Sequence, residues 1–167
     1  INTWNTSSVT DMSQLFKNKT TFNDDISSWD TSNVTNMEGM FWDALNFDQS
    51  VSNFDTSNVT TMKRMFYYAP NFNQSVSNFD TSNVDNMYYM FSGAAAFNQS
   101  VSNFDTSKVT NMYKMFYYAT NFDQDIRDWN ISSLSITTDM FTGATKMINT
   151  YTGESGFGTT PELWFWN

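Results

Sequence analysis

Hydrophobic residues recur at intervals of 25 positions along almost the whole chain. An aromatic residue opens each unit, Val or Leu follows five positions later, and Met, Phe, Ala and a second Phe continue the pattern in most units. The opening aromatic residues are Trp4, Trp29, Phe54, Phe79, Phe104 and Trp129. No insertion or deletion interrupts the six units, so the repeat organises the chain as a whole.

The spacing of hydrophobic residues changes within each unit. Met37, Met40, Phe41 and Ala44 have the spacing of one face of an α-helix of about two turns. The β-branched and small polar residues just before them, in segments such as "DTSNVT", predict a strand of about four to five residues. A strand and a helix of this size cannot bury a core alone, so the sequence predicts an α/β solenoid of six strand–helix coils with a parallel sheet on one face.

The repeat also predicts how the chain is divided. Residues 1–3 match the end of a preceding coil, residues 4–153 form the six-coil solenoid, and residues 154–167 form a C-terminal cap or docking segment. The last segment ends in a run of large apolar residues at 163–166. Such a run suits either a cap over the open end of the last coil or a contact with a following domain or neighbouring subunit.

Composition excludes several classes of function. The chain has 167 residues, a net charge of −9 and 18% aromatic residues, which fits one domain with a large core and no basic surface for nucleic acid. No apolar run is long enough for insertion into a membrane. The absence of Cys and His excludes disulfides, Cys/His metal sites and the usual general base at neutral pH.

The repeat resembles that of a known group of bacterial surface proteins. Its pattern runs aromatic–Asp–Thr–Ser–Asn–Val–Thr, then Met, Met–Phe, Ala and Phe–Asn/Asp–Gln, as in "TSNVTNM" and "FNQSV". This pattern is similar to the repeat of BspA-like leucine-rich-repeat surface proteins and covers residues 4 to about 151. The resemblance implies a right-handed, leucine-rich-repeat-like superhelix at the cell surface or outside the cell, with a role in adhesion, protein binding or structure. It supplies no catalytic residues, and we expect no enzyme.

A stripe of aromatic residues next to the predicted helix is the first candidate site. The core positions there are already filled by Met and Phe, so these rings are expected to be partly exposed. They are Trp42, Tyr67, Tyr68, Tyr88, Tyr89, Tyr113, Tyr117 and Tyr118. Two interpretations remain open: the rings pack against those of the neighbouring coil, or they form a surface that binds sugars or protein.

The outward face of the predicted strands is the second candidate site. Alternation along a strand places one polar ladder outside the core. Its members are Thr31, Asn33, Thr35, Thr56, Asn58 and Thr60. The ladder suits a solvated face, a contact with protein or glycan, or, as a minor alternative, ice binding, although Asp85 and Lys108 interrupt the array with charges.

Carboxylates offer the remaining candidates. A column formed by Asp30, Asp55, Asp80 and Asp105 predicts either an Asx-turn in each coil or calcium held between coils, and a single carboxylate per coil favours the turn. Otherwise no cofactor is expected, because the Met residues occupy core columns and not a metal site. Asp123 and Asp125 fall in a variant of "FNQSV", which indicates a loop and not a catalytic pair.

Two functions therefore remain. The first is a non-catalytic module for binding or adhesion, which recognises a surface glycan or protein on the repeat surface. The second is a structural spacer or assembly subunit, whose partners are neighbouring domains or subunits of a larger surface protein or filament.

Overall fold

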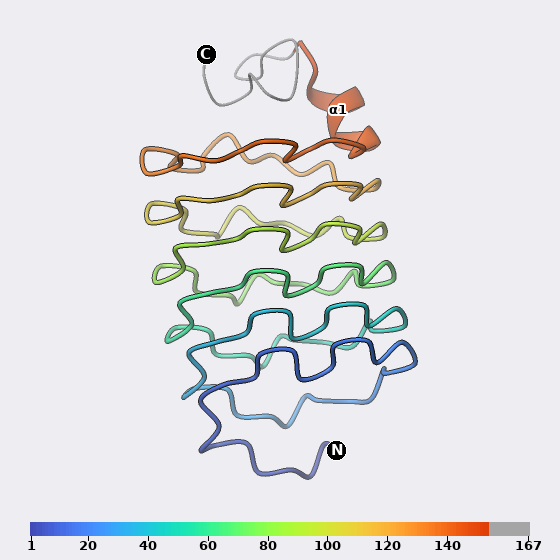
Figure 1. Cartoon of the computed structure of the whole chain (residues 1–167), viewed down its shortest axis with the longest axis vertical. Helices are drawn as coiled ribbons and strands as arrows, with labels where there is room; N and C mark the ends of the chain where they lie inside the picture. Colours follow the sequence, from blue (N-terminus) through green and yellow to red (C-terminus); the bar gives the residue numbers. More distant parts are fainter. Residues whose placement is uncertain (154–167) are drawn as a thin grey trace.

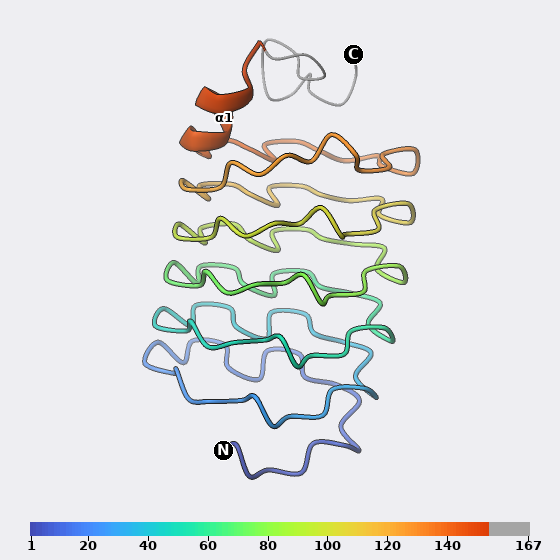
Figure 2. The ribbon, with the colours of Figure 1, turned by 180° about the vertical axis from the view of Figure 1, so that it is seen from behind.

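The computed structural model describes residues 1–153, which form six coils stacked along the long axis of the molecule (Figure 1). We number the coils 1 to 6, and they comprise residues 4–28, 29–53, 54–78, 79–103, 104–128 and 129–153. The N-terminus lies at one end of the stack, and the helix α1 (Thr145–Tyr151) lies at the other, as both views show (Figure 2). The segment 154–167, for which a cap or a docking role is predicted, lies outside the described residues.

Neighbouring coils are held in register by one parallel β-bridge each. The two partners of every bridge are 25 residues apart, so one coil takes up one sequence repeat. The bridges are Asp11–Asn36, Asn36–Thr61, Thr61–Asn86, Asn86–Asn111 and Asn111–Ile136. The repeat length therefore equals the chain length of one coil.

The predicted α/β solenoid with a parallel sheet is wrong in its elements. Within residues 1–153 the single helix is the seven-residue α1, and the pairing between coils consists of isolated bridges and forms no sheet. The prediction of six strand–helix coils, and the leucine-rich-repeat-like superhelix built from them, therefore fails. The coils are instead made of consecutive tight turns.

The segment 37–44 shows why the helical spacing of its hydrophobic residues led to the wrong prediction of an α-helix. Met40 N–H donates to Met37 O at 3.3 Å and Ala44 N–H donates to Phe41 O at 3.1 Å, so each turn closes over three residues and not four. Gly39 and Asp43 have φ of 60° and 54°, a left-handed conformation that ends an α-helix. A chain of such turns buries the same i, i+3, i+4, i+7 residues as a helix does.

The backbone groups freed by these turns bond to the next coil. In coil 1, the N–H groups of Met12, Gln14, Phe16 and Asn18 donate to the carbonyls of residues 36, 38, 40 and 42, at 2.8–3.0 Å. The same set of bonds recurs in the coils that follow. In this segment, alternate N–H groups thus donate to carbonyls of the next coil in the C-terminal direction. They do not form the continuous series of hydrogen bonds within a coil that an α-helix would have.

The predicted strand is replaced by another turn. Val34 N–H donates to Thr31 O at 2.9 Å, and the equivalent bond recurs in every coil, from Val9 to Leu134. Because the chain turns here, side chains do not alternate between two faces. The Thr that precedes the turn points inward, and its hydroxyl donates to a carbonyl of the next coil, as Thr56 does to Asp80 O at 2.9 Å.

The core consists of columns of identical or similar side chains. All eleven Met residues are buried, as are the Val and Phe columns of coils 2 to 5. Stacked Phe rings of successive coils lie 5.5–6.0 Å apart, for example 5.5 Å between Phe41 and Phe66. The core is therefore continuous from coil to coil, and no coil has a separate one.

The two ends of the core differ. At the C-terminal end, α1, which belongs to coil 6, buries Met147 and packs Ile148 and Tyr151 against the core. At the N-terminal end, Trp4 and Leu15 of coil 1 are 55% and 41% exposed. Among the described residues, no helix is long and apolar enough to cross a membrane.

Candidate binding surface

On the aromatic side of the stack, coil 4 separates two coils that carry paired tyrosines. Coils 3 and 5 carry two consecutive tyrosines, Tyr67–Tyr68 and Tyr117–Tyr118, whereas coil 4 carries Ser92 and Gly93 at the same positions. Since residues 25 apart lie above one another, the two small residues separate two pairs of rings; Ser92 is buried, and the Tyr68 ring lies against Gly93. The candidate site lies around these two residues.

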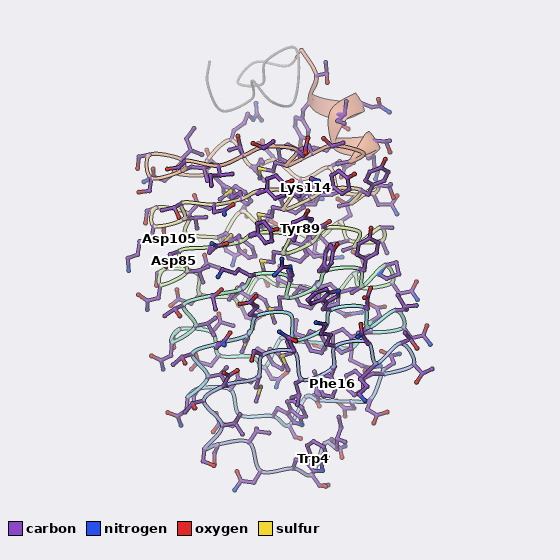
Figure 3. All side chains as sticks on the ribbon, in the orientation of Figure 1. Trp4, Phe16, Asp85, Tyr89, Asp105 and Lys114 are labelled. Atoms are coloured by element: carbon purple, nitrogen blue, oxygen red, sulfur yellow. The ribbon has the colours of Figure 1, made fainter. Side chains whose placement is uncertain are left out.

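The predicted aromatic residues come together on one face, in two groups. Trp42, Tyr67, Tyr88, Tyr89, Tyr113 and Tyr117 are partly buried. Tyr68 and Tyr118 are 48% and 53% exposed, the most open tyrosines among the described residues. Figure 3 shows Tyr89 and Lys114 on this face, one coil apart, while Trp4 lies at the N-terminal end.

The partly buried rings pack on one another. Tyr89 lies at the centre, with its ring centroid 4.4 Å from that of Tyr88, 5.1 Å from Tyr67 and 5.4 Å from Tyr113. Most of these pairs meet edge to face, which is a favourable arrangement of aromatic quadrupoles. For these partly buried rings, the structure therefore agrees with the interpretation in which they pack against rings of the neighbouring coil.

Cations complete the cluster. Arg64 lies 4.8 Å from the centroid of Tyr88, Lys114 lies 4.6 Å from that of Tyr117, and Lys17 lies 3.6 Å from that of Trp42. Arg64 also pairs with Glu38 at 3.4 Å, and Lys114 pairs with Asp139 at 3.7 Å. Cation–π contacts of this kind hold several coils together at one face.

The cluster changes the titration of its members. Burial raises the pKa of Tyr67 and of Tyr89, because the charged phenolate is poorly solvated there. The hydrogen bond with Tyr113 raises the pKa of Lys114. The phenols therefore remain neutral and Lys114 remains charged over the physiological range of pH.

The two exposed tyrosines lie on glycines of the next coil. A Cβ atom on Gly93 would come within 3.2 Å of the Tyr68 ring, and one on Gly143 would come within 2.8 Å of the Tyr118 ring. Both glycines have positive φ, 73° and 76°. The absence of a side chain lets each tyrosine rest one edge or face on backbone while the rest of the ring stays open to solvent.

A groove of about 520 Å³ runs between these tyrosines. It crosses coils 3, 4 and 5, takes its lining from three columns, and is lined by Tyr68, Pro70, Gly93, Ala95, Tyr117, Tyr118 and Thr120. None of the lining residues carries a charge. The groove is thus an open, mostly apolar hollow that spans three coils and has the exposed rings of Tyr68 and Tyr118 in its lining.

The predicted polar ladder is only partly on the surface. Thr31 and Thr56 are each 1% exposed, because the turn points them into the stack, so their assignment to an outward face is wrong. Asn33, Thr35, Asn58 and Thr60 are exposed. Their side chains donate to carbonyls of the preceding coil, as Asn58 does to Ser32 O at 2.7 Å. The exposed side chains of the ladder therefore use their donors to link neighbouring coils, and few of these donors are free to bind a ligand.

The aspartate column forms Asx-turns, as predicted. The carboxylate of Asp55 accepts the N–H of Ser57 at 3.0 Å, and Asp30, Asp80 and Asp105 accept equivalent bonds. Bonds from the serines lower the pKa of Asp80 and of Asp105. Within residues 1–153 no three carboxylates gather closely enough to hold a metal ion.

The other acidic pair is engaged in ion pairs. Asp123 pairs with Lys146 at 3.2 Å, and Asp125 pairs with Arg127, two residues further on. The two carboxylates are thus held by different cations at the surface of coils 5 and 6.

Sequence reasoning found the aromatic residues but missed the groove between them. The signal was the pair "SG" in coil 4, between two units that carry "YY" at the same positions. Pro70, Ala95 and Thr120, which line the second column, carry no pattern that distinguishes them before the coils are stacked.

A comparison with protein families identifies the repeat. The family model described as "Mycoplasma protein of unknown function, DUF285" matches residues 1–79 and 49–153, which together cover most of the chain. The chain belongs to the DUF285 family. No curated protein and no solved structure matches it significantly.

Proposed function

We propose that the protein is a non-catalytic binding module at the surface of a bacterial cell, and that the groove between Tyr68 and Tyr118 is its recognition site. The observation that carries this proposal is the groove itself, an open apolar groove of about 520 Å³ across coils 3, 4 and 5. Membership of the DUF285 family and the resemblance to BspA-like surface repeats support a place outside the cell.

The chemistry of the chain supports binding over catalysis. Cys and His are absent from the sequence. The carboxylates of Asp30, Asp80 and Asp105 accept bonds within turns, and Asp123 and Asp125 are paired with cations. An exposed aromatic ring is, by contrast, a typical anchor for a partner.

A groove-filling variant tests the proposal. Ala95→Trp places a large ring in the groove, and Leu45→Trp is the matched control, since Leu45 occupies the same column in coil 2 and is 40% exposed outside the groove. Wild type and both variants are screened on arrays of oligosaccharides and of peptides. We expect wild type and Leu45→Trp to bind a common set of probes that Ala95→Trp loses. Equal binding by all three proteins, or no binding, contradicts the proposal.

The N-terminal end favours a second function, that of an assembly subunit. Trp4, Val9 and Leu15 line an apolar pocket of about 410 Å³ there, and a second pocket of about 570 Å³ lies beside it. If this end joins another subunit, Trp4→Ser together with Leu15→Asn will lower the mass measured by light scattering at high concentration. An unchanged monomer in both proteins argues against assembly through this end.

A further inference from the structure

The lining of the groove restricts what it can bind. Thr120 is the only residue with a non-aromatic polar side chain among those that line it, and its hydroxyl already donates to Ala95 O at 3.3 Å. Sites that select a ligand by its polar groups need several fixed donors and acceptors. A sugar would find rings to stack on but few partners for its hydroxyls, so the lining favours a ligand that is mostly apolar and has isolated carbonyls.

The spacing of the two exposed tyrosines indicates the form of that ligand. Tyr68 and Tyr118 occupy the same column two coils apart, and both lean on a glycine of the following coil. At a spacing of about 4.8 Å between paired backbones, two coils correspond to roughly 10 Å. A polyproline II helix advances about 3.1 Å per residue, so residues three apart are about 9 Å apart. The two rings therefore match prolines at positions i and i+3.

Hydrogen bonding fits the same form. A polyproline II helix has no internal hydrogen bonds, so its carbonyls remain free to accept. The phenol groups of Tyr68 and Tyr118 form no hydrogen bond with another residue in 1–153, so each can donate one to such a carbonyl. Recognition of proline-rich segments by aromatic grooves uses this combination of ring packing and donation.

A carboxylate in the column of the two exposed tyrosines indicates a flanking residue. Asp43 occupies the column of Tyr68, Gly93 and Tyr118, one coil before Tyr68. Its carboxylate makes no ion pair with any residue in the described part of the chain. The protein as a whole carries a charge of −9. Because Lys114 lies 4.6 Å from the Tyr117 ring in coil 5, the carboxylate and the overall charge favour a cationic ligand residue on the coil 2 side, before the prolines.

We propose that the groove binds a proline-rich segment of a partner protein in the polyproline II conformation. Two prolines three residues apart pack on Tyr68 and Tyr118, and a flanking Arg or Lys approaches Asp43. This inference rests on the proposed binding function and specifies the ligand.

Fluorescence anisotropy with labelled synthetic peptides tests the inference on the full chain. The probe is a ten-residue peptide with an Arg followed by two prolines three residues apart, and the control peptides have the prolines two or four residues apart. We expect the probe to bind at least about tenfold more tightly than either control. Equal affinity for all three spacings, or no binding of the probe, overturns the inference.

Variants assign the contacts. Tyr68→Ala and Tyr118→Ala are each expected to weaken binding of the probe about tenfold, and Tyr→Phe at either position about threefold, because Phe keeps the ring and loses the donor. Asp43→Asn is expected to reduce both the affinity and its dependence on salt. Leu45→Trp, outside the groove, should bind as wild type does. Melting curves confirm folding, and full affinity in both Ala variants overturns the proposal.

An oligosaccharide panel separates this inference from the broader function. Binding of a sugar that Ala95→Trp loses, without binding of the peptide, refutes the proline-rich ligand and leaves the groove as a recognition site. Peptide binding that survives in Ala95→Trp refutes both.

Discussion

Coil 1 and coil 3 have nearly the same hydrophobic pattern but very different burial. Leu15 is 41% exposed in coil 1, whereas Met65, two repeats later in the same column, is fully buried. Trp4 is 55% exposed, and Phe54 in its column is 1% exposed. The difference teaches that a hydrophobic position has no fixed environment in this fold. Its burial depends on whether a coil lies on both sides.

The comparison also distinguishes two kinds of contact between coils: those that a coil makes with the following coil and those that it makes with the preceding coil. Thr6 in coil 1 donates to Asp30 O at 2.9 Å, as Thr81 in coil 4 does to Asp105 O. Within residues 1–153, coil 1 therefore makes the same kind of contact with the following coil as an inner coil does, and the difference lies on its other side. Four experiments test this distinction.

The largest expected difference is in the core column. Met65→Ala is expected to lower the free energy of unfolding by about 3 kcal/mol, because it opens a cavity between two coils. Leu15→Ala, in the same column of coil 1, should cost less than about 1 kcal/mol, since water already reaches that side chain. Urea denaturation measures both, and equal costs would show that coil position does not decide burial.

An added coil should make the first coil behave as an inner one. We would place a copy of residues 26–50 directly before Ile1, since Ile26 and Ile1 occupy the same column. Burial of Trp4 and Leu15 is expected to raise stability by about 2 kcal/mol. A shift of tryptophan fluorescence to shorter wavelength reports the burial, and a copy with Ser at its Met positions is the control. An unchanged spectrum contradicts the expected stacking.

The buried threonines should show no difference between the two coils. Thr6→Val and Thr81→Val each remove a hydroxyl that bonds to the next coil, at 2.9 Å in both cases. We expect each substitution to cost about 1 kcal/mol, measured by thermal unfolding. A much smaller cost at Thr6 would mean that coil 1 is loosened as a whole, and not merely uncovered.

The smallest effect is in the response to acid. Bonds from Ser82 lower the pKa of Asp80 in the folded state, so the stability that this group contributes is present above the unfolded pKa of about 3.9. That contribution is lost as pH falls through the lower folded value. Coil 1 has Asn5 in the same column, and its side chain accepts the N–H of Ser7 at 3.1 Å without titrating. Asp80→Asn should therefore slightly weaken the pH dependence of unfolding below pH 4, measured by thermal unfolding at several pH values.

The sequence was sufficient for the repeat length, the columns, the buried methionines and the Asx-turns. These follow from which residues recur, and no backbone conformation is needed to derive them. The strands and helices could not be predicted correctly, because the spacing of Met37, Met40 and Phe41 is shared by a helix and by successive turns. What decides between them is the bonding of alternate N–H groups to the next coil, a long-range choice that local propensity does not encode.

The candidate site could also be predicted only in part: its aromatic residues could be found from the sequence, but the groove could not. Tyr68 and Tyr118 belong to the predicted aromatic stripe, but the groove depends on Gly93 between them. Its lining also includes Pro70 and Ala95, from a column that carries no signal of its own. The error at Thr31 and Thr56 has the same origin as the error in the strands, since both assumed side chains that alternate.

The small residues of coil 4 have a consequence for how such a protein can change. Removing residues 79–103 would delete one full turn of the stack and still leave every column in line. Tyr68 would then lie directly next to Tyr118, with no glycine for its ring to rest on and no channel between the two. Loss or gain of a single unit could thus abolish or create a recognition site while the architecture survives, so specificity can be inherited separately from length.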